Sequence, residues 1–185
     1  VGNGGNDTFF ANTKVPGVGV GSTLKGGSGS DSFEFNSFGL TSVALASNAD
    51  NDTIRLTGPT VESTVWGGKG EDSIQLRNTL TDSYIYANSG NDTIDVTDRY
   101  AGSASRSDGN RYGFASAEVD AGSGHDDIHL SGVLQGSITT GSGTDTVVLT
   151  AQQYRTLQEG DRSIPTGEFY NGAYVETVYE TVEAQ

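Results

Sequence analysis

An aspartate recurs through most of the chain in a glycine-rich setting, and its best copies read GGSGSD at 26–31 and GGKGED at 67–72. Glycine accepts positive φ and lets backbone carbonyls turn inward without a Cβ clash. Carbonyl and carboxylate oxygens are hard ligands, of which Ca²⁺ takes about six to eight in flexible geometry, whereas Mg²⁺ demands a stricter octahedron. The pattern indicates a series of calcium sites centred on Asp7, Asp31, Asp52, Asp72, Asp92, Asp126 and Asp145.

The aspartates return at a nearly constant interval. Successive ones are 24, 21, 20, 20, 34 and 19 residues apart. Such a period is typical of solenoids, in which each repeat is one coil and only a stack of coils buries a continuous core. The two longest intervals indicate insertions near residues 11–20 and 97–114, both rich in turn-forming residues.

Apolar and polar residues alternate on both sides of each turn. After Asp72, for example, Ile74 and Leu76 flank the polar Gln75, and Val65 stands seven residues before the aspartate. Alternation with this period predicts strands with one buried face. We therefore predict an all-β protein, a right-handed parallel β-roll or β-helix. Each coil would contain a strand, a glycine-rich turn, a second strand and a looser turn.

The repeat ends near residue 150, so we predict a solenoid domain over 1–150 and a C-terminal cap and tail over 151–185. TAQQ at 150–153 is a capping box and Gly160 ends a helical pattern, which predicts a short cap helix that seals the solenoid. The last stretch, GAYVETVYETVEAQ, fits helical spacing but has the composition of a strand, which could add to a neighbouring subunit.

The turn sequence G-G-x-G-x-D resembles the calcium-binding nonapeptide of repeats-in-toxin proteins, and the resemblance covers about residues 1–150. It implies a β-roll in which each Ca²⁺ lies between the turns of adjacent coils and takes carboxylate and carbonyl oxygens from both. The metal-binding residues that we expect on this basis are Asp7, Gly26, Ser28, Asp31, Asp52, Gly67, Lys69, Asp72, Asn88, Gly90, Asp92, Gly122, Gly124, Asp126, Gly141, Gly143 and Asp145.

The chain also departs from the family pattern. Family repeats return about every nine residues, with calcium turns on both edges of the roll. Here the opposite turns, TGPTVES, RNTLTDS and SGVLQGS, look irregular, so calcium is expected along one edge only. The copy NADND at 48–52 lacks the glycines and is the weakest site, and the long interval from Asp92 to Asp126 requires its insertion to loop out.

Composition limits the partners. Asp and Glu outnumber Lys and Arg by 24 to 10, giving a formal net charge of −14 that disfavours nucleic acid and anionic membranes and favours cations. No stretch approaches the roughly 18 apolar residues of a membrane span, so no membrane insertion is expected. The turns leave at most six gaps between coils, and six Ca²⁺ would change the formal charge from −14 to about −2.

Calcium would also couple to folding. Stacked carboxylates repel one another without the ion, so we expect the solenoid to become ordered when calcium binds. Extracellular calcium modules have dissociation constants of about 10⁻⁴–10⁻³ M. This range suits the outside of a cell, and the chain is therefore predicted to be secreted or exposed at the cell surface.

Other motifs have simpler interpretations. The sequence NDT at Asn6, Asn51 and Asn91 is a formal N-glycosylation sequon, but a glycan in this slot would crowd the stacked turns. His125 and His129 are expected to be surface residues. Neither a Ser-His-Asp arrangement nor a carboxylate pair stands out from the many acids, so we do not predict an enzyme.

Three aromatic residues, Trp66, Tyr84 and Tyr86, are predicted to point outward from adjacent coils. A flat aromatic patch can bind sugar rings or a protein partner. Alternatively, the 97–114 insertion, which carries Tyr100, Tyr112 and Phe114, could fold over it.

These observations favour an extracellular, calcium-binding structural repeat module of a bacterial surface-layer, fibre or adhesin protein, rigidified by Ca²⁺ after export. Its partners would be calcium and neighbouring subunits. One alternative is a C-terminal secretion or folding module of a secreted enzyme or toxin. Another is a polysaccharide-binding module that uses the aromatic patch.

Overall fold

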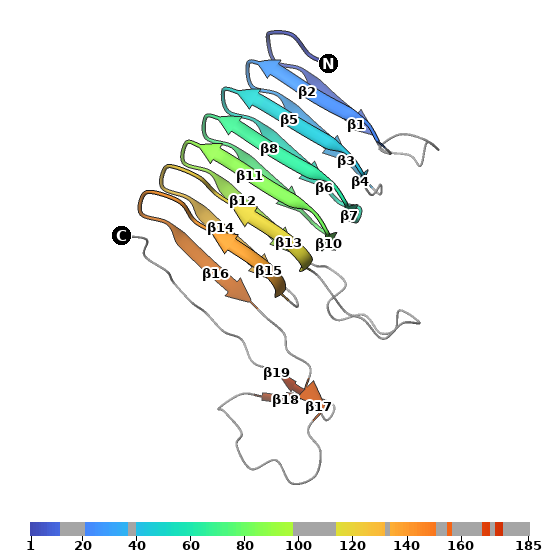
Figure 1. The fold of residues 1–185 in the computed structure, drawn as a ribbon, viewed down its shortest axis with the longest axis vertical. Helices are drawn as coiled ribbons and strands as arrows, with labels where there is room; N and C mark the ends of the chain where they lie inside the picture. Colours follow the sequence, from blue (N-terminus) through green and yellow to red (C-terminus); the bar gives the residue numbers. More distant parts are fainter. Residues whose placement is uncertain are drawn as a thin grey trace.

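The computed structural model describes residues 1–11, 21–36, 40–97, 114–131 and 134–150, and three short strands at 155–156, 168–170 and 173–175. These residues form strands and turns, with no helix among them and hence no helix that could cross a membrane. The strands stack in parallel to form a β-solenoid (Figure 1), which confirms the predicted fold class. The expected insertions lie almost entirely outside the described residues.

The first sheet contains the strands that follow the aspartate turns. It has seven strands, all parallel and in the order in which the coils occur in the chain. Equivalent residues lie side by side, so that Ile54 pairs with Ile74, and Ile74 with Ile94. The strands are β1 (Thr8–Ala11), β3 (Ser32–Phe35), β6 (Thr53–Leu56), β9 (Ser73–Leu76), β12 (Thr93–Thr97), β14 (Asp127–Ser131) and β16 (Thr146–Thr150).

The second sheet has nine strands and carries the chain into each turn. Three of them are short strands beside a corner: β4 (Leu40–Thr41), β7 (Thr60–Val61) and β10 (Leu80–Thr81). The start of β13 pairs with β10 and its end with β11, so one strand spans both parts of the sheet. The longer strands are β2 (Thr23–Ser28), β5 (Ala44–Ala49), β8 (Thr64–Lys69), β11 (Tyr84–Ser89), β13 (Phe114–Asp120) and β15 (Leu134–Thr139).

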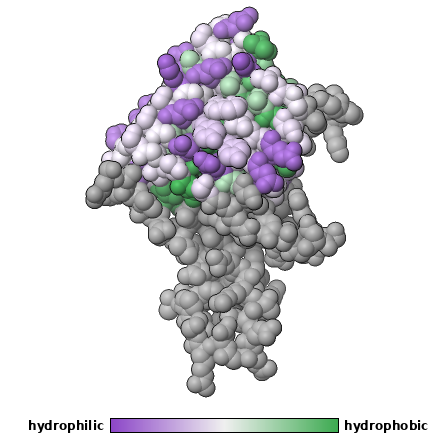
Figure 2. All heavy atoms as spheres, viewed as in Figure 1, coloured by the Kyte–Doolittle hydropathy of each residue, from purple (hydrophilic) through white to green (hydrophobic). Residues whose placement is uncertain are grey.

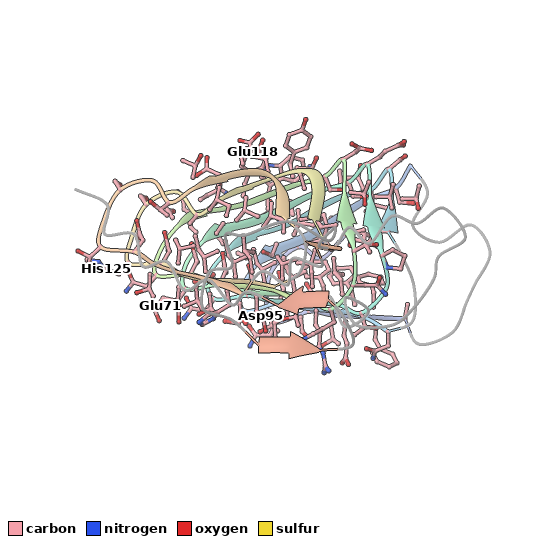
Figure 3. The ribbon with its side chains drawn as sticks, turned by 90° about the horizontal axis from the view of Figure 1, so that it is seen from below. Glu71, Asp95, Glu118 and His125 are labelled. Atoms are coloured by element: carbon pink, nitrogen blue, oxygen red, sulfur yellow. The ribbon has the colours of Figure 1, made fainter. Side chains whose placement is uncertain are left out.

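The core lies between the two sheets, which form two layers joined by a rounded turn that bears Glu71 and His125 (Figure 3). Ile74 and Ile94 of the first sheet and Val65 and Ile85 of the second have 0% exposure. Each fully buried aliphatic side chain of this size stabilises the fold by about 1.5–3 kcal/mol. The alternating columns read from the sequence are therefore confirmed as the core.

The edge opposite the aspartate turns is more regular than the sequence indicated. The corner residues Ser42, Glu62 and Asp82 all have positive φ, of 54°, 49° and 47°. Behind them, the buried Oγ of Ser83 accepts the N–H of Ser63 at 3.0 Å, and Ser63 Oγ accepts the N–H of Val43 at 3.1 Å. A serine ladder thus stabilises this edge, and the expectation of irregular turns is wrong for the turns at 57–63 and 77–83. The third such turn, at 131–137, includes residues outside the described part of the chain.

Beyond the solenoid, β17 (Arg155–Thr156), β19 (Ala173–Val175) and β18 (Glu168–Tyr170) form an antiparallel sheet in that order. The predicted cap helix lies mostly outside the described residues, and the two that are described, 155–156, form a strand. The start of the ambiguous C-terminal stretch is strand β19.

The described surface is mixed in character. On the face shown in Figure 2, strongly hydrophilic side chains are interspersed with weakly polar ones, and hydrophobic atoms form only small patches. Phe10 and Tyr84 are the large aromatic side chains that the described part of the chain exposes most, at 58% and 44%.

Candidate metal centre

The glycine-rich turns share one backbone conformation. From Asp31 to Asp145, the residues four and two places before each aspartate have positive φ, as at Gly68 (120°) and Gly70 (121°). In the copy that lacks glycine, Asn48 and Asp50 take the same places with φ of 87° and 74°. Asparagine and aspartate tolerate this region better than other L-residues, so the copy at 48–52 has the same turn as its neighbours.

Stacking of the turns explains the glycines. A Cβ at Gly90 would lie 1.7 Å from the carbonyl oxygen of Gly70, and one at Gly124 would lie 1.8 Å from that of Gly90. Real Cβ atoms never approach oxygen this closely, so neither Gly90 nor Gly124 could carry a side chain in these stacked turns. Glycine at these two positions is therefore a requirement of coil stacking, whether or not a metal is present, whereas Asp50 takes the equivalent place in its own turn and Asn48 and Asn88 take the place two residues earlier in theirs.

The aspartates form a continuous ladder. From Asp7 to Asp126, the backbone N–H of each aspartate donates to Oδ1 of the aspartate in the next coil. The six aspartates from Asp31 to Asp145 are only 1–2% exposed. The six bonds are Asp7 to Asp31 (2.8 Å), Asp31 to Asp52 (2.6 Å), Asp52 to Asp72 (2.9 Å), Asp72 to Asp92 (2.8 Å), Asp92 to Asp126 (2.8 Å) and Asp126 to Asp145 (3.0 Å).

The second carboxylate oxygen of every aspartate in the ladder is buried without a partner. Oδ2 of Asp7, Asp31, Asp52, Asp72, Asp92, Asp126 and Asp145 accepts no hydrogen bond. A buried polar atom without a partner costs about 1–3 kcal/mol, and more if it is charged. Seven such atoms on one edge are far too many for chance, because buried polar groups are nearly always satisfied. They need a proton or a cation.

Backbone carbonyls face the same small spaces. The position that a Cβ of Gly67 would take is 2.6 Å from Asp72 Oδ2 and 3.0 Å from the carbonyl oxygen of Ala87 in the next coil. At Gly26 the corresponding distances are 2.1 Å to Asp31 Oδ2 and 2.7 Å to the carbonyl oxygen of Ser47. Two acceptors therefore converge at each of these places, and only a small residue fits beside them.

Ser47 takes the position of Gly26 and Gly67 in its own coil, five residues before the aspartate, and the sequence did not mark it as a site residue. Its Oγ donates to the carbonyl oxygen of Gly67 at 2.5 Å and so satisfies one acceptor. Burial raises the pKa of Asp52, while the N–H of Asp31, which Oδ1 accepts, acts in the opposite direction. A serine among glycines and alanines was the only signal for this role.

Burial also raises the pKa of the aspartates in the middle of the ladder. It raises the pKa of Asp72 to about 6 and that of Asp92 to about 7, although each Oδ1 accepts an N–H that lowers it. The pKa of Asp126 is raised by burial and by the charge of Asp145. In the absence of a metal, Asp72 and Asp92 therefore retain protons closer to neutral pH than an ordinary carboxylate does.

The other predicted metal-binding residues have several different roles in the structure. Gly26 and Gly67 line the spaces beside the carboxylates. The carbonyls of Asn88 and Gly122 instead accept N–H groups of the next turn, from Ser123 and Ser142 at 2.8 Å. The carbonyls of Gly90 and Gly124 point at the glycines of the next turn, Gly124 and Gly143, and Gly141 lies against Gly122 in the same way. Ser28 donates its N–H to the turn before it, and Lys69 lines a hollow on the outer face.

The asparagines of the NDT sequences have a structural role in the turns. Oδ1 of Asn51 accepts the N–H of Glu71 at 2.9 Å, and Asn6 and Asn91 accept the equivalent N–H of Ser30 (3.0 Å) and His125 (2.9 Å). His125 takes the same role, because its Nδ1 accepts the N–H of Thr144 at 2.9 Å. His129 points outward and lies 3.6 Å from Asp127.

Within the described residues, no three His, Cys, Asp or Glu side chains gather around one point. Each gap between coils offers two carboxylates at most, so further ligands would have to be carbonyls. The chain matches no family model, no curated protein and no solved structure. The interpretation of the ladder therefore depends on its geometry and chemistry.

Proposed function

We propose that this chain is an extracellular structural repeat module whose coils are held together by Ca²⁺ along the aspartate ladder. The observation that carries the proposal is the row of buried Oδ2 atoms without partners, one in each coil from Asp7 to Asp145. The β-solenoid fold is compatible with a structural role, because stacked repeats form stiff, extended bodies.

Calcium fits this donor set better than other common metals. The ladder offers carboxylate and carbonyl oxygens and no sulfur, since the chain has no cysteine. Such ligands suit Ca²⁺ and Mg²⁺, and Ca²⁺ tolerates the irregular, carbonyl-rich geometry of adjacent turns better. Ions in the gaps would also offset most of the formal charge of −14.

The proposed site couples metal binding to folding. Without a cation, neighbouring carboxylates are held close together in a buried row, and their repulsion and desolvation both oppose the fold. An ion that binds only the folded state stabilises it by mass action. Calcium would thus rigidify the solenoid where the ion is abundant, which is outside the cell.

The location and the larger assembly follow from the same reasoning. The turn sequence resembles that of repeats-in-toxin proteins, and we propose a bacterial surface-layer, fibre or adhesin protein as the source of the module. A module that orders in millimolar calcium would be exported in a loose state and stiffen afterwards. The same site could serve as a folding module of a secreted enzyme or toxin.

A calcium titration followed by circular dichroism tests the proposal. The full chain in chelator at pH 8 should gain β signal at about 0.1–1 mM Ca²⁺, with Mg²⁺ as the control that has no such effect. Equilibrium dialysis should then find several ions per chain, at most about six. A fully folded protein that retains no calcium and ignores its addition would contradict the proposal.

A further inference from the structure

A hollow of about 410 Å³ lies on the outer face of the second sheet, across β5, β8 and β11. Its lining includes Ala46, Asn48, Trp66, Gly68, Lys69 and Asn88. In the sheet register Gly68 stands between Asn48 and Asn88, and the absence of a side chain there leaves the floor open. Only glycine fits at this position, because a Cβ at Gly68 would lie 2.1 Å from the carbonyl oxygen of Asn48.

Trp66 is the aromatic side chain that lines the hollow, and Tyr86 stands beside it in the next coil. The rings of Trp66 and Tyr86 are stacked with centroids 6.3 Å apart, and those of Tyr84 and Tyr86 lie 6.2 Å apart and nearly parallel, at 4°. On the other side of Trp66 in the same row stands Ala46, whose methyl group is too short to cover an indole. Trp66 therefore presents ring surface to the hollow, as the sequence predicted for an outward aromatic patch.

Polar groups surround the ring of Trp66 in the hollow. Asn48 Nδ2 donates to the carbonyl oxygen of Ala46 at 3.2 Å, and Asn88 Nδ2 donates to that of Tyr86 at 3.4 Å. These bonds hold the amides against their strands, and neither Oδ1 has a partner in the part of the chain that the structure describes. The ammonium of Lys69 adds a donor at the rim. An apolar face between fixed acceptors and a donor matches a pyranose, which has an apolar C–H face and a hydroxyl edge.

Charge narrows the class of ligand. The positive charge of Lys69 in the lining would repel a cationic ligand. Glu118 and Asp120 continue the rows of Tyr84 and Tyr86 in the next coil, and Figure 3 shows Glu118 pointing away from the sheet. Together with the net charge of −14, they oppose uronic acids and sulfated sugars.

We propose that the hollow beside Trp66 is a binding site for a neutral polysaccharide made of hexose or N-acetylhexosamine rings. One ring stacks on Trp66, and its hydroxyls bond to the amide oxygens of Asn48 and Asn88. The site lies on the outer face of the sheet and the aspartate ladder lies inside the turns, so this binding and the calcium sites can be tested separately.

The chain has a single tryptophan, so its fluorescence reports on this hollow directly. The full chain in saturating calcium is titrated with soluble neutral oligosaccharides, namely glucose, mannose and N-acetylglucosamine hexamers. A saturable change in emission, with protection from acrylamide quenching, is expected for at least one of them. Oligogalacturonate and chitosan oligomers serve as anionic and cationic controls and should have no saturable effect.

Variants assign the effect to the hollow, with binding measured on immobilised glycan. Trp66→Ala should weaken binding about tenfold or more. Asn48→Gly and Asn88→Gly, which keep the positive φ of 87° and 78°, should weaken it severalfold each. Phe10→Ala is the matched control, because Phe10 is 58% exposed on the other sheet, and it should bind as the parent does.

Either of two results would overturn the proposal. The first is the absence of a saturable fluorescence change with every neutral oligosaccharide at millimolar concentration. The second is unchanged glycan binding by Trp66→Ala protein that is folded by circular dichroism. If the hollow captured only a protein partner and no glycan, the aromatic patch would be a protein interface and the glycan assignment would be wrong.

Discussion

The backbone N–H of Asp92 donates a 2.8 Å hydrogen bond to Oδ1 of Asp126, although 34 residues separate the two in sequence. The bond has the same length as that from Asp72 to Asp92, across an ordinary interval of 20 residues. The ladder therefore continues across the longest interval between successive aspartates. A proposed calcium site between these two coils needs no special geometry.

Asp92→Asn should have opposite effects with and without calcium. The amide keeps an oxygen that accepts the N–H of Asp72, but it removes a buried charge and a metal ligand. In chelator at pH 8 the variant should therefore be more folded than the parent, because the charged form is costly there. In calcium it should bind one or two fewer ions and need a higher concentration to fold.

The matched control for this variant is Asp82→Asn. Asp82 is an exposed residue of the opposite edge with φ of 47°, which asparagine tolerates. It should leave both the calcium midpoint and the number of bound ions unchanged. If Asp92→Asn stabilised the protein equally in chelator and in saturating calcium, the ladder would be a row of neutral acids and not a metal site.

The pH dependence without calcium should be the reverse of that of most proteins with paired carboxylates. Burial raises the folded-state pKa from the ordinary value of 3.8 to about 6 at Asp72 and about 7 at Asp92. The folded state thus binds more protons than the unfolded state, and stability falls as pH rises from about 4 through 7. Mild acid should partly replace calcium.

Circular dichroism and thermal melts in chelator, from pH 4.5 to pH 8, measure this effect. The β signal and the midpoint of unfolding should be higher at pH 5 than at pH 8, and saturating calcium should remove most of the difference. A midpoint that rises with pH in chelator would mean that the carboxylates are stabilised as anions without any metal.

How much of this structure could be predicted depends on which atoms carry the pattern. The core columns and the aspartate turns repeat in their residue types, so the roles of Ile74, Asp72 and Gly70 could be predicted directly from the sequence. The opposite edge repeats in its backbone, where Ser42, Glu62 and Asp82 share a positive φ but no side-chain chemistry. The serines behind them, Ser63 and Ser83, recur 20 residues apart, but the sequence does not show that each Oγ accepts an N–H of the neighbouring coil.

The candidate site shows the same division. That the aspartates align could be predicted from their spacing, but which oxygen each uses could not. The sequence does not show that Oδ1 accepts the next coil's N–H or that Oδ2 is left without a partner, as at Asp72. Likewise, the position of the NDT triplets in the turns predicts that they carry no glycan, while the hydrogen bond from Glu71 to Asn51 depends on the exact register of two turns.

Gly90→Ala should destabilise the solenoid far more than Gly5→Ala. A Cβ at Gly90 would lie 1.7 Å from the carbonyl oxygen of Gly70, at a φ of 132°, so the two coils must separate. We expect a loss of about 2–4 kcal/mol. Gly5 also has positive φ, of 92°, but nothing lies within 4 Å of its Cβ position. Its substitution should cost about 1–2 kcal/mol from backbone strain alone.

Urea unfolding in saturating calcium compares the two glycine variants. The difference between them isolates the contact between turns from the conformational preference of glycine. Equal losses would show that the turns do not stack as closely as the structure describes, and the continuity of the ladder would then be in doubt.

Asn51→Ala should lower stability through the turn that it supports and not through any loss of glycan. Its Oδ1 accepts the N–H of Glu71 at 2.9 Å, and loss of this acceptor leaves that donor to the solvent at the turn surface. The expected cost is about 0.5–1.5 kcal/mol.

Asn3→Ala is the control, because Asn3 is exposed and bonds to the next turn through its backbone carbonyl, which alanine retains. Urea unfolding in saturating calcium, with intact mass of protein from a glycosylating host, should show a lower midpoint for Asn51→Ala only and no sugar on the parent. Equal midpoints for the two variants would show that the side chain of Asn51 does not stabilise the turn.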